Sequence, residues 1–90
     1  MIRPTAEDLN HLNTVTGTLE RSESQRERAT ATRLRAVLTA SEAVRGADLA
    51  AAVEAVTAED LDSLRAYARA NLAGKRDFMQ AADLIEELRK

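Results

Sequence analysis

Apolar side chains recur every three or four residues through most of the chain, and the strict alternation expected of a half-buried strand is not found. This period predicts an all-α fold, a small bundle of about five helices in a single domain. We expect residues 1–45 to form an N-terminal helical arm with a long, partly polar helix or hairpin, and residues 46–90 to form a compact three-helix unit. The expected helices cover residues 5–16, 18–45, 48–56, 58–73 and 78–89.

A repeated octet marks where two of these helices begin. Residues 5–12, TAEDLNHL, recur almost unchanged at 57–64 as TAEDLDSL. In each copy the threonine hydroxyl can accept from the backbone N–H three residues on, and the aspartate there can accept from the threonine N–H. The octets therefore predict helices that begin just after Thr5 and Thr57. Because the likeness ends with the octets, convergence on a good capping sequence explains it more simply than an internal duplication.

Three glycines and one aspartate indicate the other helix ends. Gly46 and Gly74 each follow a periodic apolar stretch, so we expect both to end helices in the left-handed conformation that glycine adopts easily. Gly17 either ends a short first helix or lies within a longer one. Asp77, with Gln80 three residues later, is the expected cap of the last helix.

The run 20–33, ERSESQRERATATR, contains no apolar residue larger than alanine. A helix made of it would be polar all round in its middle. We expect a solvated helix that joins two apolar ends. A polar seam that faces a partner in a coiled coil and a flexible linker are open alternatives, and so is the continuity of a helix over 18–45.

The core candidates share the apolar faces of the expected helices. They are Leu34, Val37, Leu38, Val44, Leu49, Val53, Val56, Leu61, Leu64, Tyr67, Phe78, Leu84, Ile85 and Leu88.

The apolar fraction of 44% overstates the core that this chain can build. Eighteen of the residues counted are alanine, which leaves 22 larger apolar side chains, with Tyr67 and Phe78 as the only aromatic ones. A chain of 90 residues is near the lower limit of independent folding. We therefore expect self-association or a bound partner to add stability.

Charge and cysteine content narrow the class of protein. The net charge is −2 with acids and bases mixed, which favours neither a polybasic membrane patch nor a nucleic-acid-binding tail. The absence of cysteine excludes thiolate metal sites and a disulfide-stabilised extracellular scaffold. No apolar run approaches the ~20 residues that a membrane-spanning helix requires, and the N-terminus lacks the apolar core of a signal peptide. We expect a cytoplasmic protein with no membrane partner.

No residue pattern points to catalysis, a cofactor or a metal. His11 is the only histidine, and although helical spacing places Glu7 and Asp8 beside it, one histidine with acids is an incomplete metal site. Acid–base catalysis needs a cleft that separates the pKa values of two carboxylates. We expect carboxylate pairs such as Asp60 and Asp62 to be exposed and to complement helix N-termini. The expected function is therefore non-enzymatic.

A narrow apolar stripe near the N-terminus consists of Leu9, Leu12, Val15 and Leu19. It is either an interface, with a partner or between subunits, or a face that packs on the C-terminal bundle of the same chain. We expect the interface. The main hypothesis is thus a protein–protein interaction module, such as an adaptor, inhibitor, chaperone or structural subunit, that binds another protein or itself as a homo-oligomer or complex subunit.

The alternative is a small regulator that binds nucleic acid through an Arg-rich segment. The phosphate contacts would come from Arg21, Arg26, Arg28, Arg33 and Arg35. Interleaved glutamates partly neutralise this segment, and the helix expected at 58–73 carries three acids in the first turn that a recognition helix would present to DNA. Nucleic acid is therefore the less expected partner.

Overall fold

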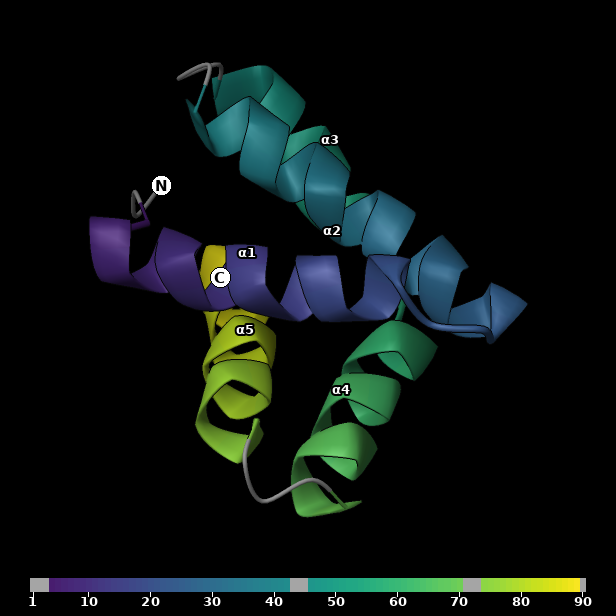
Figure 1. The fold of residues 1–90 in the computed structure, drawn as a ribbon. Coiled ribbons are helices and arrows are strands. Elements are labelled where there is room, and N and C mark those ends of the chain that lie inside the picture. The colour runs from purple at the N-terminus through teal and green to yellow at the C-terminus, as the bar shows by residue number, and fades with distance from the viewer. Residues whose placement is uncertain (1–3, 43–45, 71–73, 90) are drawn as a thin grey trace.

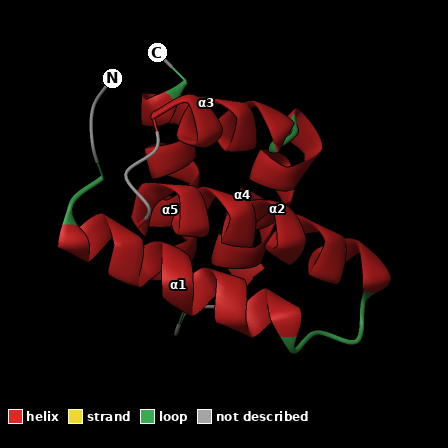
Figure 2. Ribbon diagram, turned by 90° about the horizontal axis from the view of Figure 1, so that it is seen from above, coloured by secondary structure: helices red, strands yellow, loops and turns green. Residues whose placement is uncertain are grey.

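The structure is a computed structural model that describes residues 4–42, 46–70 and 74–89 (Figures 1 and 2). Within these ranges the chain forms five α-helices and no strand, which confirms the predicted all-α class. The helices are α1 (Ala6–Glu20), α2 (Gln25–Glu42), α3 (Gly46–Ala55), α4 (Ala58–Ala70) and α5 (Lys75–Leu88).

In the view of Figure 1 the N-terminal helix α1 crosses the bundle, with α2 and α3 on one side and α4 and α5 on the other, and Figure 2 shows that it lies along one edge of the bundle. It packs against both α2 and α5, while α3 packs mainly on α2, and α4 packs on α5. Helix α3 thus packs mainly on α2 of the N-terminal half and to a smaller extent on α5. Between α2 and α4 there are few or no close backbone contacts.

Both octets form the capping boxes that the sequence predicts. The backbone N–H of Asp8 donates to Thr5 Oγ1 at 3.1 Å, and the N–H of Thr5 donates to Asp8 Oδ2 at 3.0 Å. The corresponding distances between Thr57 and Asp60 are 3.1 Å and 3.0 Å. Each box satisfies backbone donors that have no partner within their helix.

The prediction of one helix over 18–45 is wrong, because the chain turns between α1 and α2. Helix α1 continues through Gly17, where an added Cβ would meet nothing within 4 Å, and ends at Glu20. Helix α2 begins only at Gln25. The backbone N–H of Glu27 donates to Ser24 Oγ at 3.4 Å, so a Ser-x-x-Glu sequence marks this start as well.

Three expected helix ends also differ. Gly46 is the first residue of α3 rather than the C-terminal cap of the preceding helix. Gly74 is the N-cap of α5 with φ −102°, outside the left-handed region. Because α5 begins at Lys75, Asp77 lies inside its first turn and is not its cap.

The core candidates from the sequence are confirmed wherever the structure describes them. Twelve of the fourteen are buried, Tyr67 is half-buried against the core, and Val44 lies outside the described residues. Among the described residues, no helix is both long and apolar enough to cross a membrane.

Candidate functional site

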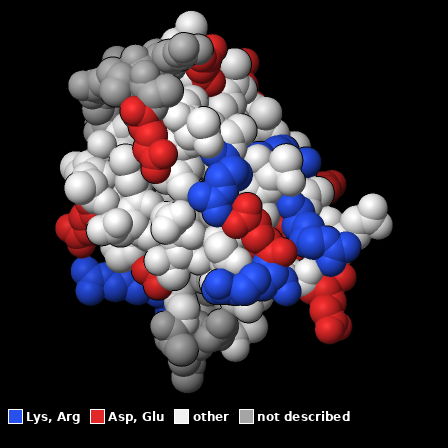
Figure 3. All heavy atoms as spheres, turned by 45° about the horizontal axis from the view of Figure 1, so that its top comes forward, with Lys and Arg blue, Asp and Glu red and all other residues white. Residues whose placement is uncertain are grey.

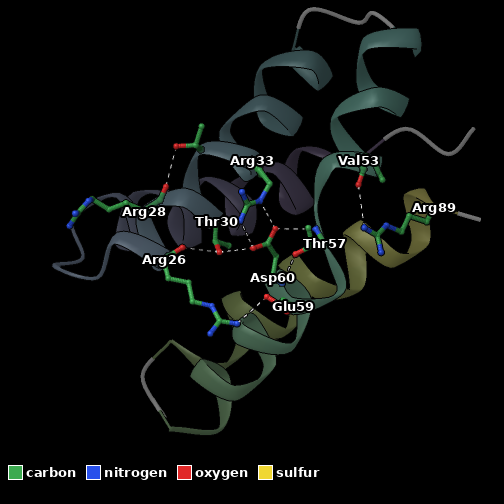
Figure 4. A network of polar contacts seen from close by, with 10 residues as sticks. Arg26, Arg28, Thr30, Arg33, Val53, Thr57, Glu59, Asp60 and Arg89 are labelled. Carbon is green, nitrogen blue, oxygen red and sulfur yellow. Dashed lines mark hydrogen bonds and ion pairs between the residues drawn. The ribbon is translucent and has the colours of Figure 1, made fainter.

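A buried carboxylate connects α4 to α2 across the gap between their backbones (Figure 4). Asp60 is 3% exposed. Its Oδ1 accepts from the Thr30 hydroxyl at 2.7 Å and from Arg33 Nη2 at 2.8 Å, while its Oδ2 accepts from Arg33 Nε at 2.6 Å. Two parallel bonds from one guanidinium fix both the distance and the orientation of the pair. These bonds add to the capping bond from Thr57.

The protonation of Asp60 follows from this environment. Burial alone would raise the pKa of its carboxyl group, because it disfavours the charged form. The hydrogen bonds from Arg33, Thr30 and the backbone of Thr57, with the charge of Arg33, outweigh burial and lower the pKa of Asp60 to about 2. The sequence led us to expect an exposed Asp60. That expectation is wrong, because Arg33 and Thr30 of α2 cover this carboxylate.

Beside this network a groove of about 270 Å³ opens between α2 and α4. Buried core side chains form its floor, and Tyr67, which stacks on Phe78 with ring centroids 4.3 Å apart, flanks it. Thr30 belongs both to the groove and to the Asp60 network. The lining residues are Leu19, Ser24, Arg26, Glu27, Thr30, Ser63, Leu64, Ala66, Tyr67 and Phe78.

The apolar stripe that we expected at an interface faces the interior of the chain. Leu12 and Val15 are 0% exposed, Leu19 is 4% exposed, and Leu9 is partly buried against the core. The second interpretation of the stripe, packing within the chain, describes this structure, because this face of α1 packs against α2 and α5. Only Leu19 contributes to the groove.

Four of the five arginines proposed for nucleic-acid contact have partners within the protein. Arg33 binds Asp60, Arg35 Nη2 lies 2.5 Å from Glu20 Oε1, Arg28 donates to the Ser22 carbonyl at 2.8 Å, and Arg26 lies 3.5 Å from Glu59. Arg21 is exposed in the turn after α1. Basic and acidic side chains lie next to one another on the face shown in Figure 3. The partners of these four arginines thus reduce the free positive charge of residues 21–35.

His11 joins α1 to α5. Its Nδ1 lies 2.6 Å from Asp77 Oδ1, and its Nε2 lies 3.7 Å from Glu7 Oε1. The spacing along α1 suggested Glu7 and Asp8 as neighbours, whereas the close partner is distant in sequence. No group of three or more histidine, cysteine, aspartate or glutamate side chains suited to a metal occurs among the described residues.

Comparison of the chain with known protein families, curated protein sequences and solved structures finds no match. The functional interpretation of the protein therefore depends on the groove and the Asp60 network. Sequence reasoning missed both, and the signal that could have pointed to Asp60 was its place in the second octet, directly before the core residue Leu61.

Proposed function

We propose that the protein is a non-enzymatic protein–protein interaction module and that the groove between α2 and α4 is its binding surface. The observation that supports this most strongly is an apolar floor, built from Leu19, Leu64 and Phe78, that opens between two helices without close backbone packing. Polar and charged side chains surround it. An apolar centre with a polar rim is the usual anatomy of a protein interface, and the occupant is an apolar side chain presented by a helix.

The size of the chain agrees with this role. With 22 apolar side chains larger than alanine among 90 residues, the core is small, and a partner that binds only the folded state adds to its stability. We infer a role as an adaptor, inhibitor, chaperone or structural subunit. The cytoplasm is the proposed location, since the sequence contains no cysteine for a disulfide-stabilised scaffold.

The alternative, nucleic-acid binding through residues 21–35, has less support. Phosphate contacts require free cationic groups, and Arg33 would have to leave the buried Asp60 uncompensated before it could bind a phosphate.

Site-specific cross-linking tests the proposal directly. A photoreactive benzoylphenylalanine replaces Ser63, which lines the groove, or Ala51 on the exposed surface of α3 as the control. In the cells that produce the protein, we expect the Ser63 probe to yield one discrete cross-linked species, either with another protein or with a second copy. The species should disappear when Ala66→Glu is added at the rim. Equal labelling from both positions, or labelling that survives Ala66→Glu, would contradict the groove as the binding surface.

A further inference from the structure

A histidine between two carboxylates connects α1 to the first turn of α5. Asp77 Oδ1 lies 2.6 Å from Nδ1 of His11, and Glu7 Oε1 lies 3.7 Å from its Nε2. Only 17% of the His11 side chain and 32% of the Asp77 side chain are exposed, so salt screens this pair less than a pair on the open surface. Both ring nitrogens therefore face an acid.

The protonation state of the imidazole decides how well it fits between these acids. A charged imidazole donates from both nitrogens, whereas a neutral one donates from one nitrogen and carries a lone pair on the other. A neutral ring that donates to Asp77 therefore turns the lone pair of Nε2 toward the Glu7 carboxylate. Burial of the ring opposes a positive charge, while a carboxylate at hydrogen-bond distance and a second one on the other side stabilise it. The geometry thus matches the charged form.

Among the described residues, no other charged side chain forms a hydrogen bond or an ion pair with His11. Lys75 and Arg76 belong to the turn of α5 that carries Asp77, but both are exposed, so salt screens their repulsion of a charged imidazole. The remaining charged groups on this part of α1 and on the second half of α2, which runs back along α1, are Asp8 in its capping box, Arg35, which pairs with Glu20, and the exposed Glu42.

The turn that His11 binds also carries a side chain of the groove. Phe78 follows Asp77 directly, is 2% exposed and stacks on Tyr67 with ring centroids 4.3 Å apart. Both rings line the groove between α2 and α4. A change in the bond between His11 and Asp77 therefore acts on the backbone turn that positions Phe78.

We propose that His11 forms a pH-responsive ion pair that holds the first turn of α5, and with it Phe78, on α1. The unfolded chain places neither carboxylate beside the imidazole, so the charged form stabilises the folded protein. This contribution is complete at low pH and is lost as the pH rises through about 6.5, where the imidazole of a model peptide loses its proton. The inference goes beyond the proposed function, because it holds whether or not the groove binds a partner.

Thermal unfolding followed by circular dichroism tests the ion pair at about pH 5.5 and about pH 8, on either side of this value. The chain has one histidine and no cysteine, so no other side chain ordinarily titrates between these two conditions. The reference is His11→Gln, which keeps a polar side chain without a titratable group. We expect the thermal midpoint of wild type, relative to that of His11→Gln, to be about 3 °C higher at the lower pH than at the higher pH.

Three carboxylate variants identify the partners of the imidazole. Asp77→Asn should remove most of this pH-dependent difference, and Glu7→Gln should remove a smaller part, because Glu7 lies farther from the ring and its side chain is 74% exposed. Asp83→Asn is the matched control. It removes a carboxylate from the same helix, but one that lies near Arg65 rather than His11, and it should leave the difference intact.

Proton NMR of wild type follows the link to Phe78 without any substitution. The chain contains one histidine, one tyrosine and one phenylalanine, so each ring gives a single set of signals. We expect the ring signals of Phe78 and Tyr67 to shift over the same pH range as those of His11, and to stop following them in Asp77→Asn.

A difference in thermal midpoint between wild type and His11→Gln that does not depend on pH would overturn the inference. So would a pH dependence that Asp77→Asn leaves unchanged, or rings of Phe78 and Tyr67 that stay fixed while His11 titrates. None of these results depends on cross-linking from position 63, so a failure of the ion pair is distinguished from a failure of the groove as a binding surface.

Discussion

The two octets begin two helices in the same way, but their aspartates have different surroundings. Asp8 and Asp60 each complete a capping box, with N–H to oxygen distances that agree between the copies. Asp8 is partly exposed, whereas Asp60 is 3% exposed and also binds Thr30 and Arg33. The local sequence determines the capping box, and the helix that packs over it determines which further hydrogen bonds and ion pairs the carboxylate forms.

This difference is the basis of the candidate site. Among the described residues, the hydrogen bonds of Asp8 stay within its own capping box. Around Asp60, side chains hold α2 and α4 together although their backbones do not pack closely. The groove opens beside that connection, and Thr30 belongs to both. The Asp60 network therefore maintains the shape of the proposed binding surface.

The largest expected effect comes from Asp60→Ala. It removes the cap acceptor and leaves the Arg33 guanidinium without its partner, while the Thr30 hydroxyl keeps only the Arg26 carbonyl as an acceptor, at 3.2 Å. We expect a loss of about 3 kcal/mol in the free energy of unfolding, measured by urea denaturation at neutral pH. A loss below about 1 kcal/mol, typical of a cap alone, would show that the connection to α2 contributes nothing.

Acid should weaken the same connection. Because the pKa of Asp60 in the folded protein is about 2, below its ordinary value, its stabilising contribution is complete above about pH 4 and is lost as the pH falls through about 2. We expect the difference in unfolding free energy between wild type and Asp60→Asn to shrink by about 2 kcal/mol over this range. A difference that is independent of pH would contradict the lowered pKa.

Thr30→Val should cost about 1.5 kcal/mol, because it removes a buried hydrogen bond to a carboxylate while it keeps the shape of the side chain. Thr32→Val is the matched control on the same helix. Thr32 is exposed and its hydroxyl donates only to the Arg28 carbonyl at 3.1 Å. The midpoint of urea unfolding of the Thr32→Val variant should therefore match that of wild type. Equal losses at the two positions would show that the bond to Asp60 adds nothing.

The smallest effect belongs to the first octet. Asp8→Ala removes one capping bond at a partly exposed position, and we expect a loss of at most about 1 kcal/mol. The midpoint of thermal unfolding, measured for Asp8→Ala and for Asp60→Ala, provides the comparison. If Asp8→Ala were the more damaging of the two, the distinction between the octets drawn here would be reversed.

Local features of the fold could be predicted from the sequence. The paired Thr and Asp of each octet predicted two helix starts, and the apolar period predicted the buried faces of α3, α4 and α5 and of the second half of α2. The break at 21–24 was missed because it contains neither glycine nor proline, although Ser24 and Glu27 carry the capping signal. Gly17 suggested that the first helix ends at residue 16, but α1 continues through it to Glu20. An α-helix tolerates an interior glycine at a modest cost.

The site depended on tertiary contacts that no local pattern contains. The stripe of Leu12, Val15 and Leu19 shows that one face of α1 is apolar, but not whether the same chain covers it. The pairing of Arg33 with Asp60 spans 27 residues, and many other acids and bases in the chain have similar local contexts. Which of them meet is decided by helix packing.

A double-mutant cycle between Arg33 and Asp60 tests most directly the claim that the second octet connects α2 to α4. Unfolding free energies of wild type, Arg33→Ala, Asp60→Ala and the double variant give the coupling energy, with the exposed pair of Arg26 and Glu59 as the control cycle. We predict a coupling of about 2 kcal/mol for Arg33 and Asp60 and at most about 0.5 kcal/mol for the control. Equal coupling in the two cycles would contradict the account.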